Sequence, residues 1–190
     1  ATDRLFVIGA GSDNGTNPPS RAFDDQKGSL WSFDRDGSNP IQHASGFKRP
    51  EFLDVSSDGQ TVFIGEQGTG SGTGFLNNGR ILRLDVATNN IHTVVTAPTA
   101  AGATGVHFDE TNDTLYYQVI KRGDTPDFNP QEIRRVTNAT AATNLSAGSD
   151  ELFLANKPSD GTLDDVAEVN VLSAGRNVQV VGEYLYWHFR

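Results

Sequence analysis

Short apolar runs separated by polar turns recur along the whole chain. Four of them resemble one another: RLFVIGAG (4–11), TVFIGEQG (61–68), TLYYQVIKRG (114–123) and EYLYWHFR (183–190). They are rich in β-branched and aromatic residues and are bounded by Gly, Asn or Asp, a pattern typical of strands. Their starts lie roughly 55 to 70 residues apart, a spacing that suits propeller blades with long loops.

Each run has strand-like neighbours. Polar loops follow the first three runs and lead to further strand patterns at 28–37, 79–89 and 131–140. Two runs are preceded by a strand and a tight turn, FLDVSSDGQ (52–60) and GVHFDETND (105–113). Asn, Asp and Gly favour such turns because they tolerate left-handed backbone conformations. The segment NNIHTVVTAP (89–98) supplies an outer, fourth strand for the second unit.

This order predicts an all-β chain made of propeller-type repeats, each an antiparallel four-stranded unit. About three units fit into residues 1–190, which form a single β-repeat domain or part of a larger propeller. Propellers usually have four or more blades, so three units predict an incomplete ring. A β-sandwich is the alternative fold. Residues 152–165 read as an insertion, and residues 168–183 align alternatively with 51–66, which would place Glu183 opposite Glu66.

Composition narrows the function classes. The net charge of −9 argues against a nucleic-acid partner, because phosphate binding needs a basic surface. The chain has no cysteine, which excludes disulfides, thiol catalysis and Cys-ligated zinc. No apolar segment approaches the roughly 20 residues of a membrane-spanning helix.

The hairpin at 51–66 carries the principal candidate site. Glu51 stands before the first apolar run of the hairpin and Glu66 follows the second. In a propeller, both positions can lie near the central channel, where carboxylates would hold calcium, a hard cation that prefers oxygen ligands. The alternative is that Arg49 pairs with Glu51 and that Glu66 faces solvent.

Residues 46–85 resemble the corresponding stretch of PhoX-type proteins, which are secreted calcium-dependent β-propeller phosphatases. The matching elements are Arg49-Pro50-Glu51, the turn Asp58-Gly59, the strand 62–64, the loop end 77–79 and the strand 81–83. The resemblance implies that Glu51 is a metal-site carboxylate near the channel. The rhythm of the chain is also similar to generic NHL-like and YWTD-like propellers.

Outside these residues the chain departs from the family pattern. The family follows with an Asp-Asn element and then an acidic pair, whereas Thr104-Gly105 and Gln118-Val119 stand at the corresponding positions here. The resemblance therefore supports the architecture more than the activity.

Other candidate binding loops or channel residues are Asp34, Asp36 and His107. The segment DRDGSN (34–39) has the alternating oxygen ligands of a calcium loop, but it lacks the downstream bidentate Glu of an EF-hand, so a hairpin turn is the favoured interpretation. His107 alternates with Val106 and Phe108, so it lies on a polar face that could point into a channel, although a lone histidine on a strand is more often an ordinary half-buried residue.

The sequence thus predicts a secreted or periplasmic, calcium-binding propeller-type module that resembles metal-dependent phosphate-ester hydrolases. The alternative is a non-enzymatic extracellular propeller that binds protein or glycan, or that serves assembly. Because an incomplete ring exposes apolar flanks, we expect self-association or a larger assembly, with Tyr184, Tyr186 and Trp187 at or near the junction.

Overall fold

The computed structural model describes residues 3–9, 27–68, 78–97, 101–121, 131–145, 149–156, 168–169, 177–182 and 184–188. Every regular element in these residues is a β-strand, and there are fourteen of them. No helix long and apolar enough to cross a membrane occurs among them. The prediction of an all-β chain is confirmed.

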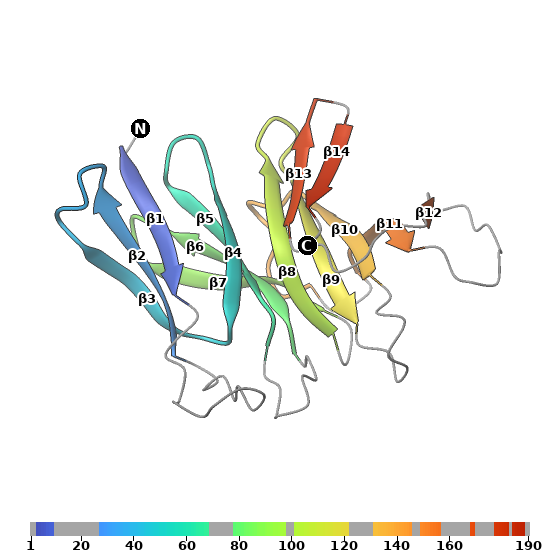
Figure 1. Cartoon of the computed structure of the whole chain (residues 1–190), viewed down its shortest axis with the longest axis horizontal. Helices are drawn as coiled ribbons and strands as arrows, with labels where there is room; N and C mark the ends of the chain where they lie inside the picture. Colours follow the sequence, from blue (N-terminus) through green and yellow to red (C-terminus); the bar gives the residue numbers. More distant parts are fainter. Residues whose placement is uncertain are drawn as a thin grey trace.

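The strands form three larger sheets and a hairpin (Figure 1). The first sheet has the order β1-β2-β3, with β1 at Arg4–Gly9, β2 at Gly28–Asp34 and β3 at Ile41–Phe47. The second sheet has the order β4-β5-β6-β7, with β4 at Pro50–Val55, β5 at Thr61–Glu66, β6 at Arg80–Asp85 and β7 at Asn90–Thr96. All neighbouring strands in these two sheets are antiparallel.

The third sheet has the order β12-β11-β10-β9-β8. Its strands are β8 (Ala101–Asp109), β9 (Thr114–Lys121), β10 (Gln131–Thr137), β11 (Glu151–Asn156) and β12 (Glu168–Val169). The first four are antiparallel, and β12 adds in parallel. The hairpin consists of β13 (Asn177–Val181) and β14 (Tyr184–His188). Residues 152–156, predicted to begin an insertion, instead belong to β11, the fourth strand of this sheet.

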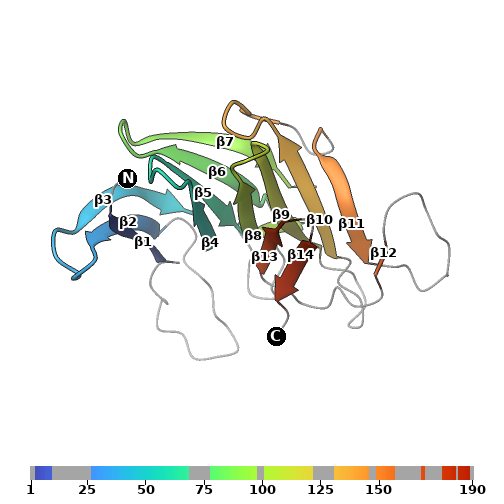
Figure 2. The same cartoon turned by 90° about the horizontal axis from the view of Figure 1, so that it is seen from above.

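The sheets stand in a row with their faces toward one another. Figure 2 shows β1, β4, β8 and the hairpin along one side of the row, and β3, β7 and β11 along the other. We call the first side the inner side. The four similar runs form β1, β5, β9 and β14, as the repeat predicted. In the last three cases the run is the second strand from the inner side, after β4, β8 or β13.

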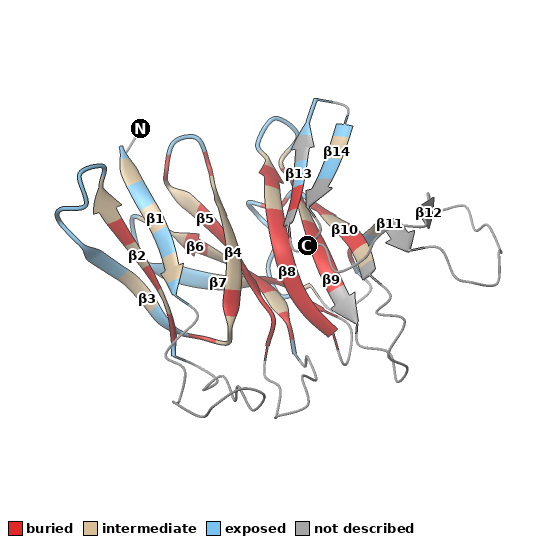
Figure 3. Ribbon diagram, viewed as in Figure 1, coloured by how far each residue is buried: buried red, intermediate tan, exposed pale blue. Residues whose placement is uncertain are grey.

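Buried apolar residues form clusters between successive sheets. Figure 3 shows where the buried positions lie along the strands. Leu30, Val62 and Ile64 belong to the cluster that joins the first and second sheets. Phe63 belongs to the cluster that joins the second and third sheets. Successive residues of β5 therefore point to opposite faces, and both faces are buried, which explains why its sequence is a continuous apolar run.

Glycines allow the second and third sheets to approach closely. A Cβ at Gly65 would lie 2.1 Å from the carbonyl oxygen of Thr104, and a Cβ at Gly79 would lie 2.3 Å from the amide nitrogen of Ala103. Neither distance leaves room for a side chain. The backbone of β8 near its bulge, between Ala103 and Val106, therefore packs directly on the second sheet.

The turn between β4 and β5 has the predicted backbone conformation. Gly59 has a φ of 70°, and its amide donates to the carbonyl of Ser56 at 2.8 Å. Asp58 accepts from the Ser56 hydroxyl at 2.6 Å and from the Gln60 amide at 2.9 Å, and these hydrogen bonds lower the pKa of its carboxyl.

We expect Gly59→Val to destabilise the protein by about 1–2 kcal/mol or more, because a β-branched residue resists positive φ. Gly59→Asn should cost clearly less, since Asn tolerates this region. Urea unfolding of the two variants measures the difference. Equal losses would contradict the role assigned to the backbone of this turn.

Candidate functional site at the start of β4

The two residues before β4, Lys48 and Arg49, are hydrogen-bonded to the residues at the end of β5. The amide of Gln67 donates to the carbonyl of Arg49, and the amide of Gly68 donates to that of Lys48, both at 3.1 Å. The Lys48 amide donates in turn to Oε1 of Glu66 at 2.9 Å. Three hydrogen bonds thus fix the backbone that presents Arg49 and Glu51.

Arg49 has an unusual backbone conformation. Its φ is 52°, in the left-handed region. The other non-glycine residues with positive φ in the described part of the chain are all Asn or Asp, which adopt this region readily. A long side chain held there costs free energy and often marks a functional position.

Glu66 lies at the end of β5 and is completely buried. Its side chain has no exposed surface, and its Oε2 accepts from Nε of Arg80 at 2.5 Å. Pro50 pairs with Glu66 across the β4–β5 ladder, so the predicted closeness of Glu66 to the start of β4 is confirmed. The alternative in which Glu66 faces solvent is wrong, because the ion pair with Arg80 holds the carboxylate inside.

Glu51 is more accessible than Glu66. Its side chain is 14% exposed, and a carboxylate oxygen lies 3.7 Å from Nε of Arg49, whose side chain is 25% exposed. The pairing of Arg49 with Glu51 that the sequence offered as an alternative is therefore present. At 3.7 Å it is a loose contact between two partly buried side chains.

Two neutral oxygen atoms are buried near this end of the second sheet. Gln67 is 3% exposed and Thr104 is fully buried. Neither Gln67 Oε1 nor Thr104 Oγ1 has a hydrogen-bond partner among the described residues. Gln67 lies two residues after Gly65, and Gly65 packs against the backbone of Thr104. Buried polar atoms are normally satisfied by a protein group, an ordered water or an ion.

The described residues contain no group of three or more His, Cys, Asp or Glu side chains that could hold a metal ion. A cation site at the start of β4 therefore needs neutral oxygen ligands in addition to the carboxylate of Glu51. This requirement favours a hard cation over zinc or copper, which prefer nitrogen and sulfur ligands.

His107 lies farther along the inner side. Its Nδ1 is 3.0 Å from Oδ2 of Asp54, an oxygen that also accepts from the Phe108 amide at 2.8 Å. Asp54 follows Glu51 by three residues on β4, or roughly 10 Å at about 3.3 Å per residue. The pair joins the inner strands β4 and β8, and it lies apart from the start of β4.

The other predicted residues do not join the site. Asp34 pairs with Arg4 at 2.6 Å, and Asp36 accepts from both the amide and the hydroxyl of Ser38, which lowers the pKa of its carboxyl. The segment 34–39 forms the hairpin turn between β2 and β3. Glu183 lies outside the described residues.

A hydrogen-bonded network that sequence patterns did not predict joins the first sheet to the second. Oγ of Ser32 lies 2.7 Å from Nε2 of His43, and Nδ1 of His43 lies 2.9 Å from Oδ1 of Asn89, in the β6–β7 turn. Nε of Arg4 donates to the Ser32 hydroxyl at 2.9 Å, which leaves the hydroxyl hydrogen for His43. This order is that of a nucleophile, base and orienting group. Ser32 is fully buried, however, so this hydrogen-bonded network has a structural role and links the first two sheets.

A second buried network lies within the third sheet. Asp150 accepts from the Tyr117 hydroxyl and, at 2.5 Å, from Nε of Arg134, which also pairs with Glu132 at 2.8 Å. Burial and the hydrogen bond to Asp150 raise the pKa of the Tyr117 hydroxyl far above its usual value. Tyr117 therefore stays protonated and donates to Asp150, which suits a structural role.

Comparison with solved structures identifies the fold. An oligogalacturonate lyase in complex with manganese matches with a TM-score of 0.55 and 13% sequence identity, over 83% of this chain and 40% of that chain. A putative TolB from Agrobacterium tumefaciens matches with a TM-score of 0.48 and 17% identity, over 68% of this chain and 42% of that one. This chain thus spans less than half the length of either structure. No protein-family model and no curated protein matches it. At this identity the likeness to the lyase shows a β-propeller fold and nothing further.

The buried ion pair generates a stability prediction. Arg80→Met should destabilise the protein by about 3–5 kcal/mol, because it leaves the Glu66 carboxylate buried without its cation. The double variant Glu66→Gln/Arg80→Met should recover much of that loss, since no buried charge is left. Denaturant unfolding measures both. A loss below about 1 kcal/mol in the single variant would contradict the importance of the pair.

Proposed function

We propose that the chain is a calcium-binding β-propeller module whose cation lies at the start of β4. The observation that carries this proposal is the pair of buried oxygen atoms without hydrogen-bond partners, Gln67 Oε1 and Thr104 Oγ1. Together with the Glu51 carboxylate they offer three oxygen ligands, and calcium prefers six to eight, including backbone carbonyls and water. Thr104 stands where the PhoX-type pattern has an Asp-Asn element, so an oxygen atom is retained there although a charge is lost.

The low charge of this ligand set indicates weak binding. Both oxygens of Glu66 already accept hydrogen bonds from Arg80 and Lys48, so Glu66 positions the segment and Glu51 supplies the negative charge. Calcium sites with few carboxylates bind at about 10⁻⁴–10⁻³ M in extracellular modules. Such affinity suits a secreted or periplasmic protein.

A phosphate ester is the ligand class that fits this site best. Arg49 places a guanidinium beside the proposed cation position, and guanidinium groups recognise phosphate oxygens in a bidentate manner. If the module is catalytic, calcium would polarise the phosphoryl oxygen and neutralise the charge that develops in the transition state. The resemblance of residues 46–85 to PhoX-type phosphatases supports this reaction. The lyase that shares the fold is in complex with manganese, another divalent metal.

A second candidate function is assembly without catalysis. Leu5 and Val7 are 50% and 49% exposed on the first sheet, and Tyr184 and Tyr186 are 69% and 56% exposed on the hairpin. These apolar side chains lie on the first sheet and on the hairpin that packs against the third sheet. Exposed apolar faces of this kind are typical of protein interfaces.

The cation site predicts stabilisation by calcium. Calcium at about 100 times its Kd should add roughly 2.7 kcal/mol to the free energy of unfolding, because it binds only the native state. Thermal unfolding in EDTA and in millimolar calcium measures this effect. Glu51→Gln should abolish the shift in the thermal midpoint, whereas Glu110→Gln, on the turn after β8, should keep it.

Coincident midpoints for the unmodified protein in EDTA and calcium would contradict the site. Where calcium stabilises the protein, turnover of a phosphate monoester that depends on Glu51 would identify an enzyme. Stabilisation without turnover would favour a binding module.

The exposed ends predict self-association. At micromolar concentration, light scattering should give a mass at least twice the 20.5 kDa of one chain. Tyr184→Ser/Tyr186→Ser should shift the protein toward the monomer, since it removes apolar surface without changing the core. A stable monomer with cooperative unfolding would contradict this prediction.

A further inference from the structure

The side chain of Arg80 has hydrogen-bond donors that the protein does not use. Its Nε donates to the buried carboxylate of Glu66 at 2.5 Å, and this is the only hydrogen bond or ion pair of the side chain in the described part of the chain. The terminal nitrogens Nη1 and Nη2 therefore have no acceptor there. The side chain is 31% exposed, so solvent and dissolved ligands reach it.

The ion pair with Glu66 also fixes the orientation of the guanidinium group. The other oxygen of Glu66 accepts from the Lys48 amide at 2.9 Å, so the carboxylate is held from two sides. A guanidinium group held through Nε presents its outer nitrogens as a planar fork that matches two oxygen atoms of an anion. A fork that is already fixed loses little side-chain entropy when a ligand binds.

Lys48 places a second cation beside Arg80. The two residues contact different oxygens of one carboxylate, that of Glu66. The half-buried Lys48 side chain forms no ion pair with the residues that the structure describes. Glu66 neutralises one of the two charges, which leaves an excess positive charge at this place in a chain of net charge −9. Such a local excess favours an anionic ligand.

These groups lie on the face of the second sheet that is turned toward the first sheet. Ile64 belongs to the cluster between these two sheets, and Glu66 follows it by two residues on β5. Residues two apart on a strand share a face, and Arg80 pairs with Glu66 across the ladder. Gly65 lies on the other face, against Thr104. The second sheet therefore separates Arg80 from the neutral oxygen of Thr104 that is proposed to bind the cation.

We propose that Arg80 and Lys48 form a binding subsite for a phosphate group, separate from the cation site. Arg80 would donate two hydrogen bonds to two phosphate oxygens, and the Lys48 ammonium group would supply a second positive charge. A phosphate dianion gains more from two adjacent cations than a carboxylate does, because a carboxylate carries a single charge. The subsite needs no metal, so it does not depend on the proposed calcium ion.

Calorimetric titration with inorganic phosphate in EDTA tests the proposal on the 190-residue protein. Binding should be saturable and should shift the Nε–H NMR signal of Arg80, whereas acetate at the same ionic strength should bind clearly more weakly. Arg80→Lys should weaken phosphate binding about tenfold or more, since Lys keeps the charge and the pairing with Glu66 but lacks the fork. Lys48→Gln should weaken it several-fold, because one of the two charges is lost.

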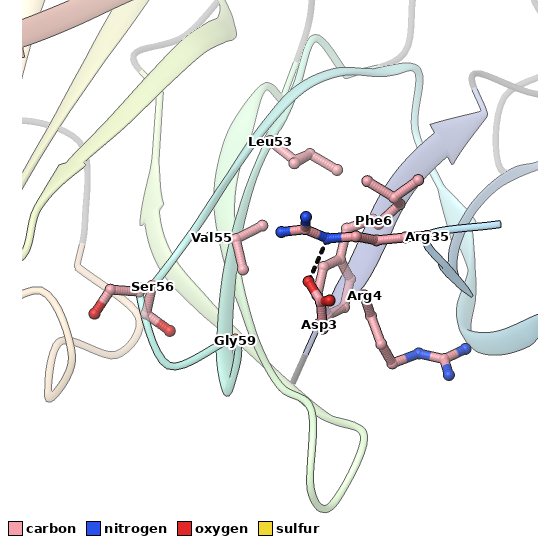
Figure 4. A pocket seen from close by; sticks show the side chains of 10 residues that line it. Asp3, Arg4, Phe6, Arg35, Leu53, Val55, Ser56 and Gly59 are labelled. Carbon is pink, nitrogen blue, oxygen red and sulfur yellow. Dashed lines mark ion pairs between the residues drawn. The ribbon is translucent and has the colours of Figure 1, made fainter. Parts of the chain in front are cut away.

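Arg35→Gln is the matched control, because it also removes one positive charge. Arg35 pairs with Asp3 (Figure 4), and its side chain is 74% exposed. It follows β2, whose first residue, Gly28, packs on Pro50 at the start of β4. The length of β2, roughly 20 Å at about 3.3 Å per residue, therefore separates Arg35 from the subsite. Because this distance exceeds the Debye length, the control should leave phosphate affinity unchanged within about twofold.

Absence of saturable phosphate binding, equal affinity for acetate, or equal losses in Lys48→Gln and Arg35→Gln would overturn the proposal. Urea unfolding of Arg80→Lys shows whether that variant keeps its fold, and Lys48→Gln tests the subsite without changing the Glu66 ion pair.

The outcome also separates this subsite from the proposed function. Loss of phosphate binding in Arg49→Gln, with full binding in Lys48→Gln and Arg80→Lys, would place the phosphate beside the cation position and overturn the subsite alone. Phosphate binding that depends on Arg80 and Lys48 would support the subsite even where calcium leaves the thermal midpoint unchanged, a result that contradicts only the cation site.

Discussion

The buried carboxylate of Glu66 is the constraint around which the start of β4 is built. A charge without exposed surface must be paired, and Arg80 on β6 supplies the cation at 2.5 Å. The second oxygen of Glu66 accepts the Lys48 amide and so fixes the chain just before β4. That contact, with two backbone hydrogen bonds, holds Arg49 in its left-handed conformation and presents Glu51 beside it. An ion pair that serves packing thus also orders the proposed ligand residues.

Close packing of the second and third sheets determines which ligands are available there. Gly65 and Gly79 let the backbone of β8 approach without an intervening side chain. The approach buries Thr104 together with Gln67, and their oxygen atoms gain no protein donor among the described residues. An acidic residue at either position would bury a further charge in this contact, at considerable cost in free energy. Uncharged oxygen atoms are therefore the ligands that this tightly packed region can offer to the proposed cation.

Local patterns predicted the strands and turns well. The four similar runs are strands, Gly59 has positive φ, and Pro50 lies opposite Glu66. These features were predictable because residue periodicity and turn-forming residues determine the local backbone conformation. Partners distant in the sequence were not predictable in this way. No residue next to Glu66 in the sequence identifies Arg80 as its partner. The hydrogen bond between His43 and Asn89 forms only because the first two sheets pack together. Strand β11 of the third sheet was mistaken for an insertion, because residues 152–156 follow a polar segment rather than a tight turn.

The central claim is that a cation at the start of β4 uses carboxylate and neutral oxygens together. A crystal structure of the protein grown with manganese as a substitute for calcium tests it most directly, because anomalous scattering locates the metal. The account predicts an anomalous peak bound by Glu51 with oxygen ligands from Gln67 and Thr104. Ordered water at Gln67 and Thr104, with no metal at Glu51, would contradict it.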